Sequence, residues 1–575
     1  MTVSSLHAAA PTAAPAGHDA IADGGLRRRE AIEAAALGLT ALAVFFFHLG
    51  SYGLWEPDEA RYAEIAREML AGGNFIVPHL NYVPYIEKPP LLYWTTALAF
   101  HFLGVNEFAA RIAPALSALL GVAVTWWLGR RLFGHRRALL AAAILVTSPL
   151  YAAMAQVLTT DMVLTALLTV AFLCFFLQWR EGRRWWVAMY LAMALAVLTK
   201  GPVGAALPVT AGFVFIWRRG ELRGALGKFH AAAGALIVAA IALPWFAIVA
   251  ARLPGFLDFY IVGEHFRRVF VASYSHDEPF YFYLPVILAG LLPWSVCLPL
   301  LPFEGTRGPA RSWCAIVATL VVALFSAADA KLIPYILPAV PMLALLLADA
   351  IVSAIENRAA HSARRLAPSA FIVATGGVLC AGGVAAIALF AASPYLRNAD
   401  VMVLRRLLPI IGTVLLIGGC ASLATFVRGR FAPGLTLVVA TATAAMLIAT
   451  YGRIEVEWLH SWAPLARDLA ARAPSATLID YRRYPQAIPF YTRRRVILAS
   501  PFLSELRFGA EHSADRERFF PATDAQLLAL WTKDRSAVLI INEADLRRLA
   551  PQLGPTRVIA TQGRKQAVAH QGEPD

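Results

Sequence analysis

The sequence is poor in charge. Only 15% of its 575 residues are Asp, Glu, Lys or Arg, against about 25% in a soluble domain. Hydrophobic residues make up 59%, and the mean hydropathy is +0.60. Apolar runs of about 20 residues, each long enough to cross a bilayer, recur through the first four-fifths of the chain. These features exclude an ordinary soluble fold and predict a polytopic α-helical membrane protein, since helices satisfy their own backbone hydrogen bonds in lipid.

Cysteine is also scarce, and nucleotide-binding motifs are missing. The five cysteines all lie in apolar runs and form no CxxC pair, so they indicate packing rather than zinc or redox chemistry. The polar tail contains no GxGxxG sequence and no P-loop, which leaves nucleotide binding without support.

Positive charge is in excess, with 51 Lys and Arg against 37 Asp and Glu, a net charge of +14. Such a balance first suggests nucleic acid. Here the arginines cluster in short loops between apolar runs, where membrane topology places them. We therefore expect no nucleic-acid partner, although a few cations could hold anionic lipid headgroups.

The composition divides the chain into three parts. Residues 1–26 are rich in Ala, Pro, Gly and His and are expected to form a disordered cytoplasmic tail. Residues 27–450 hold the apolar runs, and residues 451–575 return to a soluble composition. Three short strand patterns and two helical patterns in this last part predict a small α/β domain. The patterns are Ala476–Tyr481, Arg495–Ala499, Ala537–Asn542, Asp524–Lys533 and Glu543–Leu549.

The arginine clusters give a test of topology. If all are cytoplasmic, two spans must separate successive clusters, and they do so when the short run 90–105 is re-entrant or interfacial. The count is then about 13 spans. The tail lies outside, with the two large outer loops 51–107 and 251–282. The expected spans are 31–50, 108–129, 137–155, 159–179, 185–199, 202–217, 229–250, 283–302, 311–327, 332–355, 369–391, 406–427 and 432–450.

The stretch Leu54–Pro90 is polar and aromatic although it lies between apolar blocks. Pro57 followed by Asp58 and Glu59 fits a helix start. Apolar positions further on predict an amphipathic helix lying on the membrane surface. Taken alone, Asp58 fits a helix cap. Polar density beside a membrane is costly unless it stays wet or builds a site, and we predict a site.

Other candidate residues lie at span ends. Asp161 suits a helix N-terminus and Lys200 a helix C-terminus, so each has an ordinary structural explanation. Glu87 and Lys88, before a Pro-Pro pair, also fit a neutralised snorkelling pair. One acid with one histidine, Glu87 with His265, is a weak indication of a metal site. A divalent ion such as zinc is the one cofactor that the sequence suggests. The expected topology places seven such residues on one side, which predicts a single outward-facing cavity. They are Asp58, Glu87, Lys88, Asp161, Lys200, Arg268 and Lys331.

Several strings resemble one family. WEPDEARYAEIAREML, YIEKPP, LTKG, GEHFRRV and KLIPYILP are similar to the lipid A aminoarabinose transferases, which are GT-C glycosyltransferases of the protein mannosyltransferase-like superfamily. The similarity runs from the first span to about Pro341, and the later part matches only in layout. Arg267 stands where the family more often has an uncharged polar residue. Either Arg267 or Arg268 could therefore meet phosphate, and Arg268 matches better.

The resemblance implies a GT-C fold and a reaction. An inverting transferase would move 4-amino-4-deoxy-L-arabinose from undecaprenyl phosphate to a lipid A phosphate at the periplasmic face of the bacterial inner membrane, giving resistance to polymyxin. Its partners would be those two lipids and the surrounding membrane lipids, and the protein would be a monomer. The implied catalytic acids are Asp58, Glu59 and Asp161; the implied phosphate ligands are Lys88, Arg268, Lys200, Arg61 and Lys331; Tyr62, Tyr85 and Tyr335 would line the sugar pocket.

Three other functions fit parts of the pattern. A protein O-mannosyltransferase-like enzyme has a hydroxyl acceptor, which would make Asp58 a true base. A secondary transporter usually has repeated halves and mid-membrane charges, whereas the charges here cluster at span ends and no internal repeat is evident. A lipid-binding scaffold would leave the acid cluster without a purpose.

Overall fold

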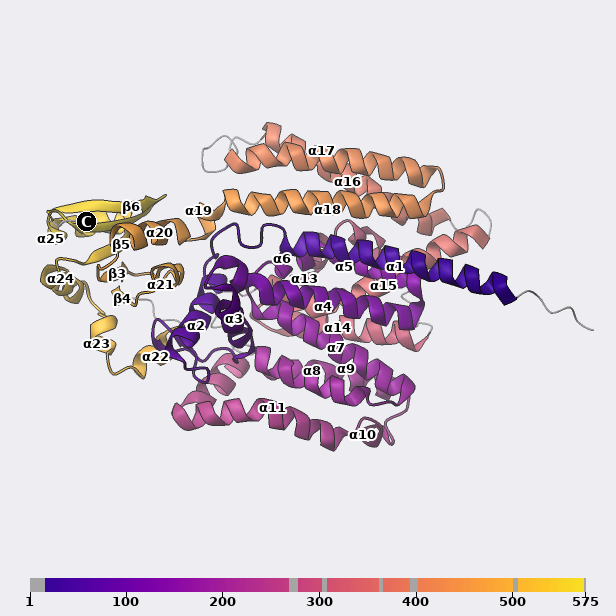
Figure 1. Cartoon of the computed structure of the whole chain (residues 1–575), viewed down its shortest axis with the longest axis horizontal. Coiled ribbons are helices and arrows are strands. Elements are labelled where there is room, and N and C mark those ends of the chain that lie inside the picture. Colours follow the sequence, from indigo (N-terminus) through magenta and orange to yellow (C-terminus); the bar gives the residue numbers. More distant parts are fainter. Residues whose placement is uncertain are drawn as a thin grey trace, which may run out of the picture.

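The computed structural model describes residues 16–267, 278–301, 308–360, 366–392, 402–499 and 505–572. Long helices run side by side in a bundle, and a small domain with a sheet caps one end of it (Figure 1). Between bundle and domain lies the first loop, with α2 (Asp58–Gly72), β1 (His79–Leu80), β2 (Val83–Pro84) and α3 (Leu91–Leu103). The first described helix, α1 (Ala16–Phe46), projects from the far end of the bundle (Figure 1).

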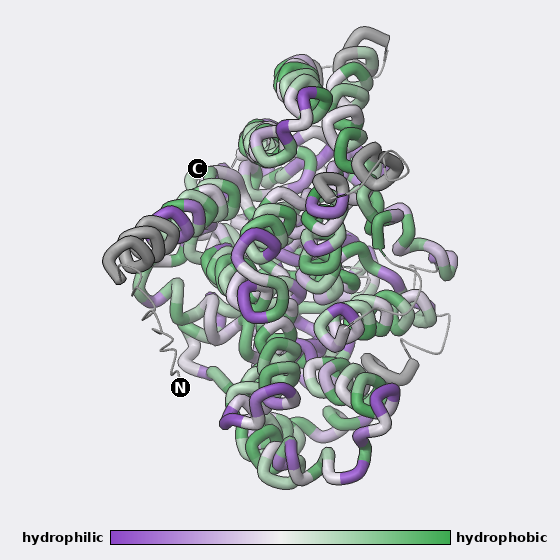
Figure 2. The backbone as a smooth tube through the Cα atoms, turned by 90° about the vertical axis from the view of Figure 1, so that its right-hand side faces the viewer, coloured by the Kyte–Doolittle hydropathy of each residue, from purple (hydrophilic) through white to green (hydrophobic). Residues whose placement is uncertain are grey.

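A helix or a bent helix pair occupies each run expected to span the membrane. Among the described residues, seven helices are long and apolar enough to cross a membrane, or nine with two bent pairs counted as single spans. Seen end-on, hydrophobic stretches predominate in the bundle, with hydrophilic ones among them (Figure 2). The bundle elements after α3 are α4 (Glu107–Phe133), α5 (His135–Val146), α6 (Pro149–Ala155), α7 (Thr160–Glu181), α8 (Trp185–Lys200), α9 (Val203–Arg218), α10 (Ala225–Lys228), α11 (Ala231–Arg252), η1 (Asp258–Arg267), α13 (Tyr283–Gly290), η2 (Trp294–Leu300), α14 (Pro309–Ala327), η3 (Ile333–Ala339), α15 (Val340–Ala360), α16 (Leu366–Ala392), α17 (Met402–Val427) and α18 (Phe431–Glu455).

Helix α3 occupies the run that was expected to be re-entrant or interfacial. It has 13 residues, so it is about 20 Å long at 1.5 Å per residue. That is shorter than the roughly 30 Å hydrocarbon core of a bilayer. The length agrees with a segment that does not cross.

The arginine-rich loops lie together at the end of the bundle far from the sheet. Arg130 pairs with Glu30 at 3.1 Å and Arg131 with Glu181 at 2.8 Å. Asp349 accepts ion pairs from Arg137 at 3.0 Å and Arg311 at 2.5 Å. The first half of α1 and the ends of α4, α7 and α15 therefore share one face, as the two-span spacing of the clusters requires.

The C-terminal domain is an α/β domain whose sheet has the order β4-β3-β5-β7-β6. The three strand patterns and both helical patterns expected in this region are present. The central strand β3 pairs in parallel with β4 and β5, and β7 runs antiparallel to β5 and β6. The elements are α19 (Glu457–His460), α20 (Ala463–Arg472), β3 (Leu478–Tyr481), α21 (Ala487–Thr492), β4 (Val496–Ala499), α22 (Arg507–Glu511), α23 (Arg516–Phe519), α24 (Asp524–Lys533), β5 (Val538–Asn542), α25 (Glu543–Leu553), β6 (Thr556–Gln562) and β7 (Lys565–His570).

The first loop packs against this domain instead of lying free on a surface. Helix α2 was expected to be amphipathic, with its polar side in solvent. Instead ten of its fifteen residues are buried, including Glu64 and Arg67, which pair at 2.6 Å. Asn81 exchanges two hydrogen bonds of 2.9 Å with the backbone of Val496. The domain thus covers the polar side of α2, and the Glu64–Arg67 pair compensates two of the charges that the cover desolvates.

Candidate functional site

The exposed acid of the first loop begins α2. Asp58 lies in the first turn, after Pro57, and its side chain is 50% exposed. Its carboxylate is 3.5 Å from Nη1 of Arg61, one turn later on the same helix. The other terminal nitrogen of Arg61, Nη2, lies 2.5 Å from Glu505 of the C-terminal domain. One guanidinium therefore joins two carboxylates from parts of the chain that are far apart in sequence.

A second pair forms between two spans. Asp161 opens α7 and Lys200 closes α8, and Nζ of Lys200 donates to Oδ1 of Asp161 at 2.5 Å. The same ammonium lies 4.2 Å from the centre of the Tyr335 ring, a cation–π distance. The sequence singled out all three residues, and the structure brings them into direct contact.

Tyr62 connects the two pairs. Burial raises the pKa of its phenol well above the ordinary value, and the negative charges of Asp58 and Asp161 raise it further. The two acids therefore lie within electrostatic range of the same phenol. Asp58, Asp161 and Tyr62 belong to one neighbourhood, although 100 residues separate the acids in sequence.

The Glu87–Lys88 segment borders the same neighbourhood. The phenol of Tyr85 donates to Oε2 of Glu87 at 2.9 Å. Burial raises the pKa of Tyr85, and Glu87 raises it further while the positive charge of Arg61 opposes the rise. Lys88 directs its ammonium at the carbonyl oxygen of Glu87, at 3.3 Å.

Three other predicted residues are placed less fully. Lys331 is buried, and its ammonium donates to the carbonyl of Glu278 at 2.7 Å. Arg268 and the side chain of His265 lie outside the described residues. In the part of the chain that the structure describes, no three His, Cys, Asp or Glu residues are grouped to hold a metal ion.

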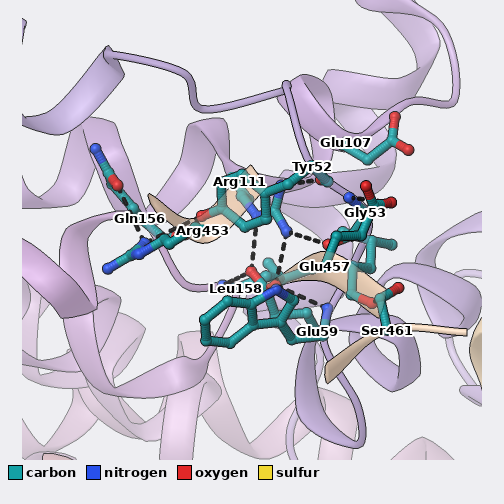
Figure 3. Close-up of polar contacts among 12 residues, drawn as sticks. Tyr52, Gly53, Glu59, Glu107, Arg111, Gln156, Leu158, Arg453, Glu457 and Ser461 are labelled. Carbon is teal, nitrogen blue, oxygen red and sulfur yellow. Dashed lines mark hydrogen bonds and ion pairs between the residues drawn. The ribbon is translucent and has the colours of Figure 1, made fainter. Parts of the chain in front are cut away.

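Glu59, expected to be catalytic, is enclosed in a structural network (Figure 3). Its side chain is 2% exposed, and its two oxygens accept from Nε and Nη2 of Arg111 at 2.8 and 2.7 Å. They also accept the backbone N–H groups of Leu158 at 2.9 Å and Trp55 at 3.0 Å. Burial works to raise the pKa of Glu59, but Arg111 and these bonds hold it below the ordinary value. We therefore correct the expected role, because this carboxylate has no free surface for a substrate.

The network around Glu59 holds the start of α2 against the bundle. Arg111 is fully buried and also donates to the carbonyls of Leu49, Tyr52 and Gly53 at 2.9–3.0 Å. These bonds join the end of span one to α4. The two adjacent acids thus have different surroundings: Glu59 faces inward and anchors the helix, while Asp58 stays accessible.

Sequence reasoning missed the residues that act across long separations. Arg111 carried one usable signal, because a charge one turn into an apolar run needs a partner. Glu505 and Gln486, which donates to it, carried none, since nothing in a soluble domain marks which side chain will meet the first loop. Tyr93 of α3 carried no signal either, because in the sequence it cannot be distinguished from the other aromatic residues of the apolar runs.

The arrangement suits a substrate that carries phosphate. Cations at Lys200, Lys88 and Lys331 can screen phosphate charge, and fixed dipoles and charges stabilise a developing anion. Asp161 pairs with Lys200, whose ammonium also lies over the Tyr335 ring, and Asp58 pairs with Arg61. Opposite charges from α2, α7 and α8 are therefore available to one bound molecule.

Comparison with known proteins gives two family regions. Residues 87–248 match the model described as dolichyl-phosphate-mannose-protein mannosyltransferase. Residues 465–570 match the aminoarabinose transferase C-terminal domain. The first region holds Glu87, Lys88, Asp161 and Lys200, and the second is the domain that carries the sheet.

Relatives of known name cover part of the chain. An undecaprenyl phosphate-α-4-amino-4-deoxy-L-arabinose arabinosyl transferase of Sodalis glossinidius is 37% identical over 333 residues, 55% of this chain and 59% of that protein. One from Pseudomonas fluorescens is 34% identical over 339 residues, 57% of each chain. The matched region therefore spans under two thirds of the length of these relatives.

Solved structures extend the likeness over nearly the whole chain. The crystal structure of ArnT from Cupriavidus metallidurans bound to undecaprenyl phosphate has a TM-score of 0.83 and 28% identity, over 93% of this chain and 97% of that one. The archaeal oligosaccharyltransferase AglB of Archaeoglobus fulgidus, with a TM-score of 0.52 and 12% identity, shares the fold alone.

The fold and its paired charges define a multi-span membrane protein with the GT-C fold and a C-terminal sheet domain. Within that class, the chain is a relative of the undecaprenyl phosphate-aminoarabinose arabinosyl transferases. The resemblance predicted from the five sequence strings is confirmed.

Proposed function

We propose that the protein is an inverting, polyprenyl-phosphate-dependent glycosyltransferase. It moves 4-amino-4-deoxy-L-arabinose from undecaprenyl phosphate to a phosphate of lipid A. This lowers the negative charge of the bacterial surface and so confers resistance to the cationic peptide polymyxin. The similarity to transferases that carry this donor in their names supports the choice of sugar. The observation that carries the proposal is the ion pair of Asp161 with Lys200, at the end of the bundle away from the arginine-rich loops, together with the electrostatic influence of Asp58 and Asp161 on the same phenol, Tyr62.

The reaction breaks one bond and forms one. An oxygen of the acceptor phosphate attacks C1 of the sugar as the bond from C1 to the donor phosphate oxygen breaks, and that oxygen keeps the electron pair. The acceptor is already ionised near neutrality, so a strong base is not needed. Attack from the face opposite the leaving group inverts C1.

Each group has a role in that step. Lys200, Lys88 and Arg268 bind the donor phosphate and stabilise the charge it gains on leaving. Lys331 and Arg61 add positive charge. Asp58 orients the acceptor or steadies positive charge on the sugar, and Asp161 holds Lys200 in place at 2.5 Å. Tyr62, Tyr85 and Tyr335 line the sugar pocket.

The proposed topology has about 13 spans. Residues 27–450 form the catalytic membrane domain in the bacterial inner membrane, and residues 451–575 form a periplasmic domain. The collection of the arginine-rich loops at one face supports this orientation, because positively charged loops face the cytoplasm. The protein works as a monomer, with its site and C-terminal domain in the periplasm.

A divalent ion held by Glu87 and His265 stays a prediction. Chelation tests it on the purified protein. Loss of transfer on adding EDTA, restored by Zn²⁺, would support a metal at this position. Unchanged transfer in EDTA would remove it.

The function is tested by mass spectrometry of lipid A from a host that supplies the aminoarabinose donor. Expression of the wild-type chain should add one aminoarabinose mass, and Asp58→Asn should abolish that addition while the protein is still made and folded. A protein O-mannosyltransferase-like enzyme would leave lipid A unchanged and glycosylate a protein. A transporter would show flux in vesicles without covalent transfer.

A further inference from the structure

One part of the site comes from the C-terminal domain. Glu505 lies just before α22, and its side chain is 22% exposed. One of its oxygens receives Arg61 at 2.5 Å, and the other accepts a hydrogen bond from the side-chain amide of Gln486. A carboxylate fixed on both oxygens is well positioned to recognise a ligand beside it.

Among the described residues, the charges at this place do not balance. Arg61 is the one cation in contact with Asp58 and Glu505 among the described residues, so the three groups carry a net negative charge at neutral pH. Burial raises the pKa of Glu505, and the negative charge of Asp58 raises it further although Arg61 opposes the rise. A second cation would relieve this repulsion. None of the described lysines or histidines pairs with either acid.

Polar atoms around the three groups also lack partners. The hydroxyl of Tyr93, Nε of Arg61 and the carbonyl oxygen of the Gln486 side chain are buried and make no hydrogen bond among the described residues. Tyr93 and Gln486 are at most 2% exposed. Tyr93 faces the same charges: burial raises the pKa of its phenol, with further contributions from Glu87 and Asp58. Buried polar atoms are nearly always paired, so a cluster of unpaired ones beside two carboxylates that share one described cation points to a ligand.

We propose that Glu505, with Asp58 and Tyr93, recognises the cationic amino group of the donor sugar and makes the enzyme specific for an amino sugar. The proposal rests on the function proposed above and deepens it. In that substrate, phosphate and amino group stand on opposite sides of the sugar ring. The protein offers matching charges, with Lys200 and Tyr335 towards the bundle and Glu505 on the C-terminal domain.

The distribution of the family regions supports this assignment. The mannosyltransferase model covers residues 87–248, which hold Lys200 and the other phosphate-binding candidates. The aminoarabinose transferase model covers residues 465–570, which hold Glu505 and Gln486. The region that carries the amino-sugar name thus supplies Glu505, which shares its described cation, Arg61, with Asp58.

The test compares two donors that differ in one group. One is undecaprenyl phosphate carrying 4-amino-4-deoxy-L-arabinose, and the other carries L-arabinose, in which a neutral hydroxyl of similar size replaces the amino group. Transfer to lipid A is measured with the full-length protein in detergent. Wild type should favour the amino donor in kcat/KM by about 10- to 100-fold, since a hydrogen bond to a charged group contributes about 1.5–3 kcal/mol.

Glu505→Gln should reduce that preference to nearly one, and Glu505→Asp should restore part of it. The matched control is Glu56→Gln. Glu56 also ties the first loop to the C-terminal domain, but it accepts the backbone N–H groups of Gln486 and Ala487, at 3.3 and 2.7 Å. Glu56→Gln weakens this contact between the first loop and the C-terminal domain, and it should therefore lower transfer from both donors equally.

The outcomes separate the two proposals. Equal loss of both donors in Glu505→Gln, with the wild-type preference kept, would show a purely structural tether and overturn the amino-group assignment while the enzyme stands. No transfer by the wild type from either donor would refute the proposed function itself. Loss of the preference for the amino donor in Glu505→Gln, but not in Glu56→Gln, supports both the proposed function and the amino-group assignment.

Discussion

Replacing Glu59 by glutamine should destabilise the protein while leaving its chemistry largely intact. The side chain keeps its volume but loses its charge and one of its two acceptor oxygens. If the remaining oxygen keeps the bonds to Nε of Arg111 and to Leu158, the bonds to Nη2 of Arg111 and to Trp55 are lost. Arg111, which is fully buried, is then left with an uncompensated charge.

The magnitude follows from those losses. A hydrogen bond to a charged group contributes about 1.5–3 kcal/mol and a neutral one about 1 kcal/mol. Breaking a buried ion pair by removing one partner costs about 3–5 kcal/mol. We therefore expect a loss of about 3–5 kcal/mol in the free energy of unfolding and a Tm about 3 °C lower.

The neighbouring acid provides the comparison. Asp58 is half exposed and makes one contact, at 3.5 Å, so Asp58→Asn should change stability by no more than about 0.5 kcal/mol. Thermal unfolding of the purified variants by intrinsic fluorescence measures stability, and transfer per folded molecule measures activity. Glu59→Gln should lower the Tm, and Asp58→Asn should lower transfer per folded molecule. A Glu59→Gln protein with wild-type Tm and no transfer would refute the structural role of Glu59.

Other predictions concern the charge pairs. Lys200→Met should lower kcat by about 10²- to 10³-fold, because the leaving phosphate loses a preorganised cation; a steady-state transfer assay checks this, and an unchanged kcat would separate Lys200 from the donor phosphate. The pKa of Glu505 is raised, so kcat/KM for the amino donor should fall on the acid side at a pH above the ordinary glutamate range, and this limb should be absent in Glu505→Gln. The folded protein lowers the pKa of Glu59, so the ionised carboxylate stabilises the fold fully above its unfolded pKa of about 4.3. That contribution is lost as the pH falls through the lower pKa of the folded state. The free energies of unfolding of wild type and Glu59→Gln should therefore become equal at that acid pH, as acid unfolding curves would show.

The sequence predicted the fold well wherever local pattern decides structure. Apolar run length marked the helices of the bundle, and alternation marked β3, β4 and β5 within two residues of their bounds. Strands β6 and β7 were not predicted, because their alternation is interrupted by charged and polar residues. The spacing of the loop arginines predicted that their clusters share one face, and the ion pairs of Arg130, Arg131 and Arg137 agree with this, whereas the count of about 13 spans stays a prediction.

The site was predicted where residues sit at the ends of elements. Asp161 and Lys200 were singled out at the ends of their spans, and the helix ends bring them within 2.5 Å. Local pattern could not distinguish Asp58 from Glu59, since adjacent positions on a helix differ only in the direction in which they point. Glu505 depends on how a separate domain docks on the first loop, and that contact leaves no local trace in the sequence.

The central claim is that Asp58 and Lys200 serve one site on the outer face, opposite the arginine-rich loops. Single cysteines at two exposed positions outside the site, Ala71→Cys near the end of α2 and Arg223→Cys in the loop after α9, can be labelled in a background without native cysteines. A membrane-impermeant thiol reagent applied to intact spheroplasts should label Ala71→Cys at once and Arg223→Cys only after lysis. Labelling of both before lysis, or of Arg223→Cys alone, would contradict the outward-facing site.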